Sequence, residues 1–403
     1  MKRVSIVLAT LGLALAPAGS SAAADPPPPT EAPAAFDSQS NGLTDAATFA
    51  LDQEIFEERE LVEDGLGPVF NAQACAECHQ SPVTGGASQV TELRAGRRDL
   101  RGRFVEPPGG SLINDRATHA DMQERVPADA TVRTFRASLS VLGDGFVEAI
   151  ANETLLRIAE KQRNDTRGRI RGEAVPVPIL ETPGAEGIGR FGWKGQHASL
   201  VSFSADAYLN EMGITTPLFP TENTSMGNSV DAYDTVADPE DDGADVEIFA
   251  RFMRATKAPP RDTALAATPA ALAGAALFDS IGCAHCHVGT IVTAPAGTVL
   301  HAGFTVPDAL GNKVIHPFSD FLLHDVGTGD GIVQNGGGST AGKIRTPPLW
   351  GLRTRSRLMH DGVSLTVNDA ILRHRGEAYS VTLSYRFLSP ARKRELSAFL
   401  SSL

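Results

Sequence analysis

The stretch Cys75-Ala76-Glu77-Cys78-His79 decides how this chain folds, and its pattern returns as Cys283-Ala284-His285-Cys286-His287. Two thiols three residues apart lie on one side of a helical turn, where each can form a thioether to a haem vinyl group. The histidine that follows can then bind the haem iron as the proximal ligand. Together the two runs use all four cysteines of the chain, so they predict two covalently bound c-type haems.

A zinc site or two disulfides are the other common uses of four cysteines in such pairs. Neither requires a histidine directly after each pair, so both explain the sequence less well than haem attachment does. The predicted attachment and iron-binding residues are therefore Cys75, Cys78 and His79 for the first haem and Cys283, Cys286 and His287 for the second.

The first residues of the chain predict a secretory signal peptide. Met1-Lys2-Arg3 is a basic start, an apolar run from Val4 to Leu15 follows, and small residues lead to a cleavage site near residue 24. The apolar run is too short for a transmembrane helix, and no other long apolar run follows it. Because covalent haem attachment fits an exported protein, we expect a periplasmic protein without a membrane span.

The chain is acidic, with a formal net charge of -12 that becomes two units more negative when Lys2 and Arg3 are removed with the signal. This charge argues against nucleic acid and against anionic membranes as partners. It suits the docking of a small basic redox donor, such as a periplasmic cytochrome c.

The length allows two domains, and we expect a mainly α fold with two cytochrome c-type haem domains. Residues 25–40 are rich in proline and are expected to form a disordered tether after the signal peptide of residues 1–24. Residues 41–262 are predicted to form the N-terminal haem domain, with a loop-rich insertion at about 82–185 that contains some strand. Residues 263–403 are predicted to form the C-terminal haem domain.

Hydrophobic periodicity and capping residues predict the helices. The expected helical segments are residues 44–60, 148–161, 245–256 and 268–281, a helix that begins at Thr366 and is stopped by Gly376, and a last helix that begins at Ser389-Pro390. Each predicted domain thus opens with a helix before its haem motif and ends with an amphipathic helix, which indicates an internal duplication.

Further motifs resemble the di-haem oxidoreductase family of peroxidase-like proteins, which is similar in turn to the bacterial di-haem cytochrome c peroxidases. The stretches that carry the resemblance span most of the chain and are residues 65–71, 189–194, 323–327, 345–352, 359–362 and 370–374. The resemblance implies that the N-terminal haem meets the oxidant and that the C-terminal haem supplies it with electrons.

The resemblance also implies roles for individual residues. It places Trp193 between the haems and Glu211, followed by Met212, beside the peroxide site, where a general acid would help to protonate the leaving oxygen. From the residues alone, Trp193 also fits plain core packing, and Glu211 also fits a surface acid. Relatives hold a calcium ion between the domains, and Thr346 and Pro348 match the segment whose carbonyls contribute to that site.

His374 is the expected sixth ligand of the second haem iron. It falls on the apolar face of the helix that begins at Thr366, although a buried histidine there could simply bond a carbonyl. Met359 and His360 are the other candidates for this position. The peroxidase relatives have methionine where this chain has His374, and His/His ligation lowers the iron potential relative to His/Met.

The first haem has no obvious sixth ligand in the sequence. No histidine follows His79 until His119, and Met122, His197 and Met212 could reach the iron only by folding back. We therefore expect an open or weakly closed iron site that can bind peroxide or another small oxygen species.

These features predict an oxidoreductase that reduces hydrogen peroxide at the N-terminal haem, with electrons entering through the C-terminal haem. A haem oxidase or oxygenase that acts on another substrate also uses an open iron site. An electron carrier without peroxidase activity is the third possibility, and it requires that both haems have six ligands. A high-spin ferric signal distinguishes an open iron site from such a carrier.

Overall fold

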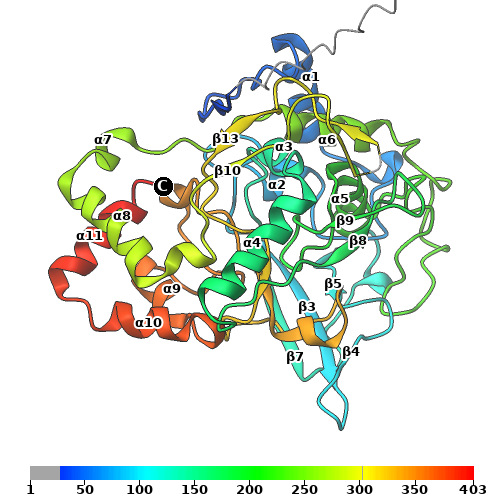
Figure 1. Ribbon diagram of the computed structural model, residues 1–403. Coiled ribbons are helices and arrows are strands. Elements are labelled where there is room, and N and C mark those ends of the chain that lie inside the picture. Colours follow the sequence, from blue (N-terminus) through cyan, green and yellow to red (C-terminus); the bar gives the residue numbers. More distant parts are fainter. Residues whose placement is uncertain (1–27, 302) are drawn as a thin grey trace, which may run out of the picture.

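The computed structural model describes residues 28–301 and 303–403, and Figure 1 shows how its elements are arranged. The helices are α1 Ala46–Glu57, α2 Cys75–Cys78, α3 Asp144–Glu148, α4 Asn152–Asp165, α5 Leu200–Ala207, α6 Ala244–Ala255, α7 Thr263–Ala266, α8 Pro269–Ile281, α9 Val367–Arg373, α10 Tyr379–Arg386 and α11 Pro390–Leu400. The strands are β1 Thr30–Glu31, β2 Val69–Phe70, β3 Thr91–Arg98, β4 Phe104–Val105, β5 Leu112–Ile113, β6 Arg116–Ala117, β7 Val132–Ala137, β8 Pro176–Pro178, β9 Glu186–Ile188, β10 Ile291–Val292, β11 Val299–Leu300, β12 Phe304–Thr305, β13 Lys313–Ile315, β14 Leu323–His324 and β15 Ile344–Arg345. The predicted signal peptide, residues 1–24, lies outside the described residues.

The larger hydrophobic core forms where α1, α3, α5 and α6 meet. Phe49 and Phe56 of α1 pack against Phe252 of α6, and the rings of Phe56 and Phe252 lie 4.7 Å apart. Phe56 also faces His79, with 6.4 Å between the ring centres. The apolar stripe that the sequence shows on α6 therefore builds the wall behind the first haem motif.

A second, smaller core joins α8 to α11 and underlies the second haem motif. Gly274 allows α8 to approach α11 closely, since a Cβ atom there would lie 2.0 Å from the carbonyl oxygen of Glu395. Both helices begin as their sequences predict, because Thr268 and Ser389 cap them ahead of a proline in the first turn.

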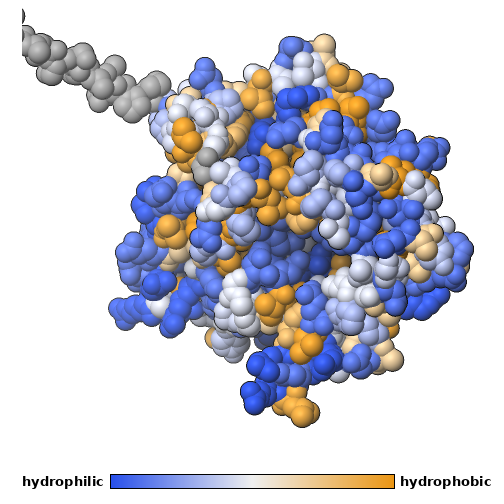
Figure 2. Space-filling view, turned by 90° about the vertical axis from the view of Figure 1, so that its right-hand side faces the viewer, coloured by the Kyte–Doolittle hydropathy of each residue, from blue (hydrophilic) through white to orange (hydrophobic). Residues whose placement is uncertain are grey.

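The region of the predicted insertion contains more strand than we expected. β3 pairs in antiparallel fashion with β4, β5 and β7, and Glu92 on β3 lies opposite Arg136 on β7. The β3–β4 hairpin forms the tip at the bottom of Figure 1, where Leu100 is fully exposed. Elsewhere on the face in Figure 2, hydrophobic residues are dispersed among hydrophilic ones.

The expectation of a disordered tether is wrong from Thr30 onward. β1 pairs in parallel with β13, and the N–H of Ala35 donates to the carbonyl of Ala258 at 3.1 Å, so backbone bonds fix this proline-rich segment.

The larger core also takes in residues from both predicted domains, such as Phe49 and Trp350, and the boundary at residue 262 stays a prediction. Among the described helices, none has the length and apolar character needed to cross a membrane.

Candidate functional site

The second C-x-x-C-H motif follows directly from the end of α8. Gly282 adopts the left-handed conformation, with φ of +101°, which ends the helix and starts the tight turn Cys283–His285. The N–H of His287 donates to the carbonyl of Cys283 at 3.0 Å, so both thiols and the imidazole belong to one compact turn. The local backbone thus provides the arrangement that two thioethers and one axial ligand require.

His287 and His374 face each other across a cavity, although α9 ends one residue before His374. The Nδ1 atom of His287 lies 3.0 Å from the carbonyl oxygen of Phe318, and that of His374 lies 2.8 Å from the carbonyl oxygen of Ala370. Each Nδ1–H therefore donates to a backbone carbonyl, which leaves Nε2 free as a ligand. Such bonds are typical of histidines that bind metal ions.

The distance between the two rings fits an iron ion held between them. Their centres are 6.5 Å apart. With metal–nitrogen bonds of about 2.0–2.1 Å and about 1.1 Å from each nitrogen to its ring centre, two axial imidazoles would be about 6.3 Å apart. Burial lowers the pKa of His287 to about 4 and also lowers that of His374, so both imidazoles are neutral, as ligation requires.

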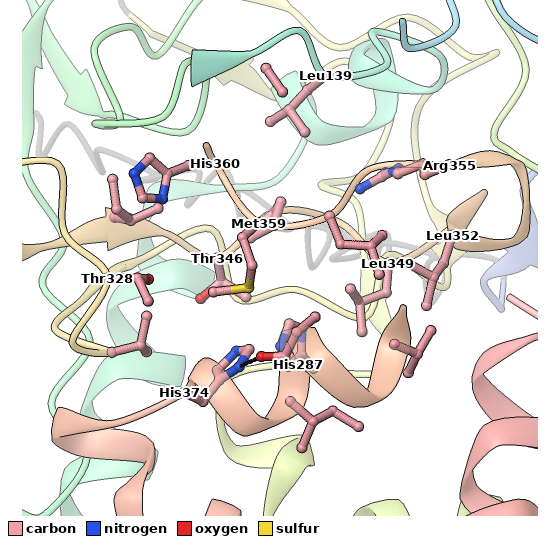
Figure 3. A pocket seen from close by; sticks show the side chains of 18 of the residues that line it. Leu139, His287, Thr328, Thr346, Leu349, Leu352, Arg355, Met359, His360 and His374 are labelled. Atoms are coloured by element: carbon pink, nitrogen blue, oxygen red, sulfur yellow. Dashed lines mark hydrogen bonds between the residues drawn. The ribbon is translucent and has the colours of Figure 1, made fainter. Parts of the chain in front are cut away.

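The cavity between these histidines has a volume of about 390 Å³. Cys283 and Cys286 lie on its wall, and the thioether of Met359 also points into it (Figure 3). Leu349 and Leu352 add apolar surface. A mostly apolar cavity with two thiols and two facing imidazoles on its wall suits a haem.

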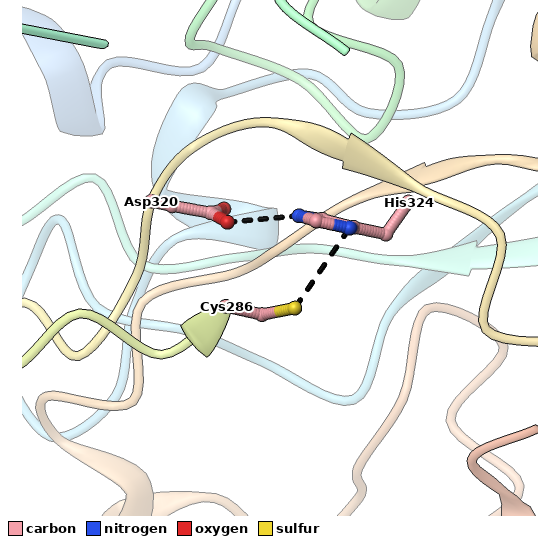
Figure 4. A group of neighbouring side chains, drawn as sticks. All are labelled: Cys286, Asp320 and His324. Carbon is pink, nitrogen blue, oxygen red and sulfur yellow. Dashed lines mark hydrogen bonds and ion pairs between the residues drawn. The ribbon is translucent and has the colours of Figure 1, made fainter. Parts of the chain in front are cut away.

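His324 lies behind Cys286 but is held by carboxylates, as Figure 4 shows in part. Its Nε2 lies 2.8 Å from Asp320, and its Nδ1 lies 2.9 Å from Glu377 and 3.8 Å from the sulfur of Cys286. Burial disfavours the charged imidazole, but Cys286 and then Asp320 raise the pKa of His324 well above its usual value. A histidine whose two nitrogens both bind carboxylates is not available to the iron.

The first C-x-x-C-H motif forms the short helix α2, and His79 follows it. The N–H of His79 donates to the carbonyl of Cys75 at 3.0 Å, and the buried Nδ1 atom of His79 has no hydrogen-bond partner among the described residues. Burial lowers the pKa of His79, so its imidazole is also neutral. Cys75 packs against the larger core and Cys283 against the smaller one, so the two cysteine pairs do not form a common zinc site.

Glu211 lies on the π-helical turn Tyr208–Met212, next to the first haem motif. Its carboxyl group accepts a hydrogen bond from Asn71 at 2.8 Å. Burial, and next the charge of Glu211, raise the pKa of the Cys78 thiol to about 12, which places the two side chains near each other. The turn therefore brings an acid to the first haem site.

Glu211 and Glu92 form a pair of acids with opposite protonation. Burial and then the charge of Glu92 raise the pKa of Glu211 to about 8. Burial would also raise the pKa of Glu92, but Arg94 at 2.7 Å and Arg136 at 3.6 Å hold it at about 2. Near neutral pH Glu92 is therefore charged and Glu211 keeps its proton.

The sequence of this chain matches the family described as "Di-haem oxidoreductase, putative peroxidase" over residues 109–403. The chain belongs to this family. Membership implies haem cofactors, and the residues around both cysteine motifs fit them.

Similar solved structures include hydrazine synthase from Kuenenia stuttgartiensis, with 14% identity and a TM-score of 0.40 over 98% of this chain and 100% of the other. A MauG-like protein associated with microbial copper homeostasis has 15% identity and a TM-score of 0.42, over 96% of this chain and 94% of the other. The diheme peroxidase BthA from Burkholderia thailandensis has 15% identity and a TM-score of 0.43, over 93% and 94%. No curated protein sequence matches this chain.

Trp193 of this di-haem family member lies on the wall of the His287–His374 cavity. Its indole N–H donates to the carbonyl of Ala137 at 2.8 Å. Its ring contacts the His360 ring edge-on, with 6.1 Å between the ring centres. Ala137 is the last residue of β7, the strand that pairs with β3 and its Glu92. Trp193 thus lies between the cavity of the second haem motif and strands β3 and β7, which carry Glu92.

The other histidines and methionines considered for the first iron have different surroundings. His119 is at the surface and stacks on Tyr233, Met122 packs in a small separate core, and Nε2 of His197 lies 3.2 Å from Asp206. Met212 is buried in the larger core. His119, Met122 and His197 thus have other contacts, and the open site at the first iron stays a prediction.

The predicted calcium segment is part of an internal hydrogen-bond network. The carbonyl oxygen of Thr346 accepts a hydrogen bond from the hydroxyl of Ser319 at 2.7 Å. The N–H of Thr346 donates to the carbonyl of Leu322. A calcium ion at Thr346 and Pro348 stays a prediction.

Three residues of the site carry no sequence signal of their role, namely Glu92, Arg94 and Arg136. They lie on β3 and β7, and no sequence motif indicates that these strands lie beside Glu211. The alternation of polar and apolar residues in β7 was a weak signal for the strand, but nothing local indicates its partner.

Proposed function

We propose that this protein is a periplasmic di-haem enzyme that reduces hydrogen peroxide to water at the His79 haem, with electrons entering through the His287 haem. The observation that carries the proposal is the acid pair of Glu92 and Glu211, one charged and the other protonated near neutral pH. Pairs of acids whose pKa values are driven apart are typical of sites that perform acid–base catalysis.

When bound, the haems would supply the iron redox chemistry that peroxide reduction needs, namely cleavage of the oxygen–oxygen bond and storage of electrons. Glu211 would hold a proton on its carboxyl group and deliver it to the leaving oxygen. Asn71 orients that carboxyl group through its amide. Arg94 and Arg136 keep Glu92 ionised, and Glu92 in turn keeps the proton on Glu211.

The second haem site would serve electron transfer. His287 and His374 would hold the iron from both sides through Nε2, while Phe318 and Ala370 fix their rings through Nδ1. Two protein ligands leave no position for peroxide, and imidazole in place of thioether favours a lower potential. Trp193 would lie on the path between this site and the first haem.

The proposed donor is a small basic redox protein, such as a periplasmic cytochrome c, which the acidic chain would attract. Each peroxide needs two electrons and two protons to give two waters, so two donor molecules would be oxidised per peroxide. The proposed location follows from the predicted signal peptide and from covalent haem attachment.

The test is a peroxidase assay on the haem-loaded protein isolated from a periplasmic fraction. Reduced cytochrome c should be oxidised only when peroxide is added, in a ratio of two donors to one peroxide. If the donor is oxidised without peroxide, or peroxide has no effect on either haem spectrum, the protein is not a peroxidase.

A further inference from the structure

A cluster of acids lies in the long loop between α5 and α6, away from both haem motifs. Glu222, Asp234, Asp238 and Glu240 each place one carboxylate oxygen within 4.8 Å of those of the other three. In the chain, these residues follow the π-helical turn that carries Glu211. Acidic groups at the surface are common, so the cluster alone indicates no ligand.

The carboxylate of Glu222 is the feature that separates this cluster from a solvated acidic loop. Both of its oxygens are buried, and neither has a hydrogen-bond partner among the described residues. One oxygen of Glu240 is buried and unpartnered as well. Burying a carboxylate without a partner costs free energy, so a compensating group is expected.

Repulsion among the four acidic groups increases the free-energy cost of the cluster further. Glu222 lies among the carboxylates of Asp234, Asp238 and Glu240, and like charges at such short range repel one another. The hydroxyl of Thr215 lies 2.5 Å from an oxygen of Asp238 and 2.5 Å from an oxygen of Glu240. One hydroxyl has a single proton, so it can donate to only one of these oxygens.

We propose that Glu222, Asp234, Asp238 and Glu240 bind one calcium ion. Calcium takes oxygen ligands at about 2.3–2.6 Å, so ligands on opposite sides of one ion are about 4.6–5.2 Å apart. The 4.8 Å limit within the cluster is compatible with a single ion at its centre. Asp238 is exposed, which gives the ion a way in from solvent.

The site would stabilise the side of the molecule that carries the first haem. Glu240 accepts a hydrogen bond from the N–H of Thr215 at 2.6 Å, four residues after Glu211. Glu240 also packs against Gly65, since a Cβ atom added to Gly65 would lie 2.7 Å from the Cγ atom of Glu240. A bound ion would therefore join the loop to the turn before Cys75, at a place separate from the Thr346 segment.

The test measures calcium bound to the haem-loaded protein after removal of metals with a chelator and dialysis against calcium. Glu222→Gln and Asp238→Asn should each bind one calcium fewer than the unmodified chain, and should lose the rise of about 2–5 °C in Tm that calcium gives it. Asp231→Asn, at an exposed acid outside the cluster, should keep both properties. The stoichiometry separates this site from any other calcium site in the chain.

Equal calcium content in Glu222→Gln, Asp238→Asn and the unmodified chain would overturn the proposal. Glu222→Gln puts a neutral amide of similar size in place of a buried acid, so it should fold at least as well as the unmodified chain without calcium. If magnesium at the same concentration gave an equal rise in Tm, the assignment to calcium would be wrong, because magnesium needs shorter bonds of about 2.0–2.1 Å. These results concern the loop alone, so they leave the peroxidase proposal to its own test.

Discussion

The proton on Glu211 gives the sharpest prediction for activity. Its pKa of about 8 compares with an ordinary value of 4.5. At pH 7 a carboxyl group with the raised pKa is about 90% protonated, whereas one with the ordinary pKa is only about 0.3% protonated. The surroundings of Glu211 therefore increase the population of the proton donor about 300-fold at this pH.

In the proposed mechanism the protonated form is the active one, so peroxide turnover should be constant below pH 8 and fall about tenfold for each pH unit above it. Glu211→Gln should lower turnover by about a hundredfold or more and remove this pH dependence, with both haems still attached. Glu92→Gln should move the fall in turnover to lower pH, since the charge of Glu92 helps to raise the pKa of Glu211.

The assay follows donor oxidation at saturating peroxide from pH 5.5 to 9.5, and Glu63→Gln, at an exposed acid, serves as the control. Turnover that increases as the pH rises through 8 would refute the reasoning, because it would make the ionised group the active one. Unchanged turnover in Glu211→Gln would show that this acid is structural.

Three further predictions concern the cofactors and the fold. Mass spectrometry of the periplasmic protein should show the mass of two haems after signal removal, and one haem or bound zinc would contradict the assignment. His374→Met should keep the second haem attached and six-coordinate but raise its potential in a redox titration, and an unchanged potential would exclude His374 as a ligand. The side chain of Asp330 is fully buried between Arg136 at 2.7 Å and Lys194 at 3.1 Å. Asp330→Asn should therefore lower the free energy of unfolding by about 3–5 kcal/mol in denaturant titrations. A loss below about 1 kcal/mol would show that the two cations find other partners.

Local sequence signals were enough to predict several helices, whereas haem attachment at the two C-x-x-C-H motifs stays a prediction. Thr268 and Ser389 cap α8 and α11 where predicted, because a cap and a following proline act within one turn. The prediction for α9 was less accurate, since Gly376 does not end the helix. It ends at Arg373, and His374 reaches the cavity because its Nδ1 bonds to Ala370, four residues back.

The acid pair could not be predicted in the same way. Glu92 lies 119 positions before Glu211, on a strand whose partners are set by pairing between distant segments. The pKa of each acid depends on burial and on Arg94 and Arg136, which only the folded chain brings together. Proline content likewise indicated disorder for residues 25–40, but β13 offers a strand edge to which Thr30 and Glu31 bind.

The central claim is that one haem iron is open and that the other is held by His287 and His374. Electron paramagnetic resonance of the oxidised, haem-loaded protein tests it most directly. We expect one high-spin and one low-spin ferric signal, and His374→Ala should convert the low-spin signal into a second high-spin signal. A wholly low-spin spectrum, or a low-spin signal that His374→Ala leaves unchanged, would contradict the claim.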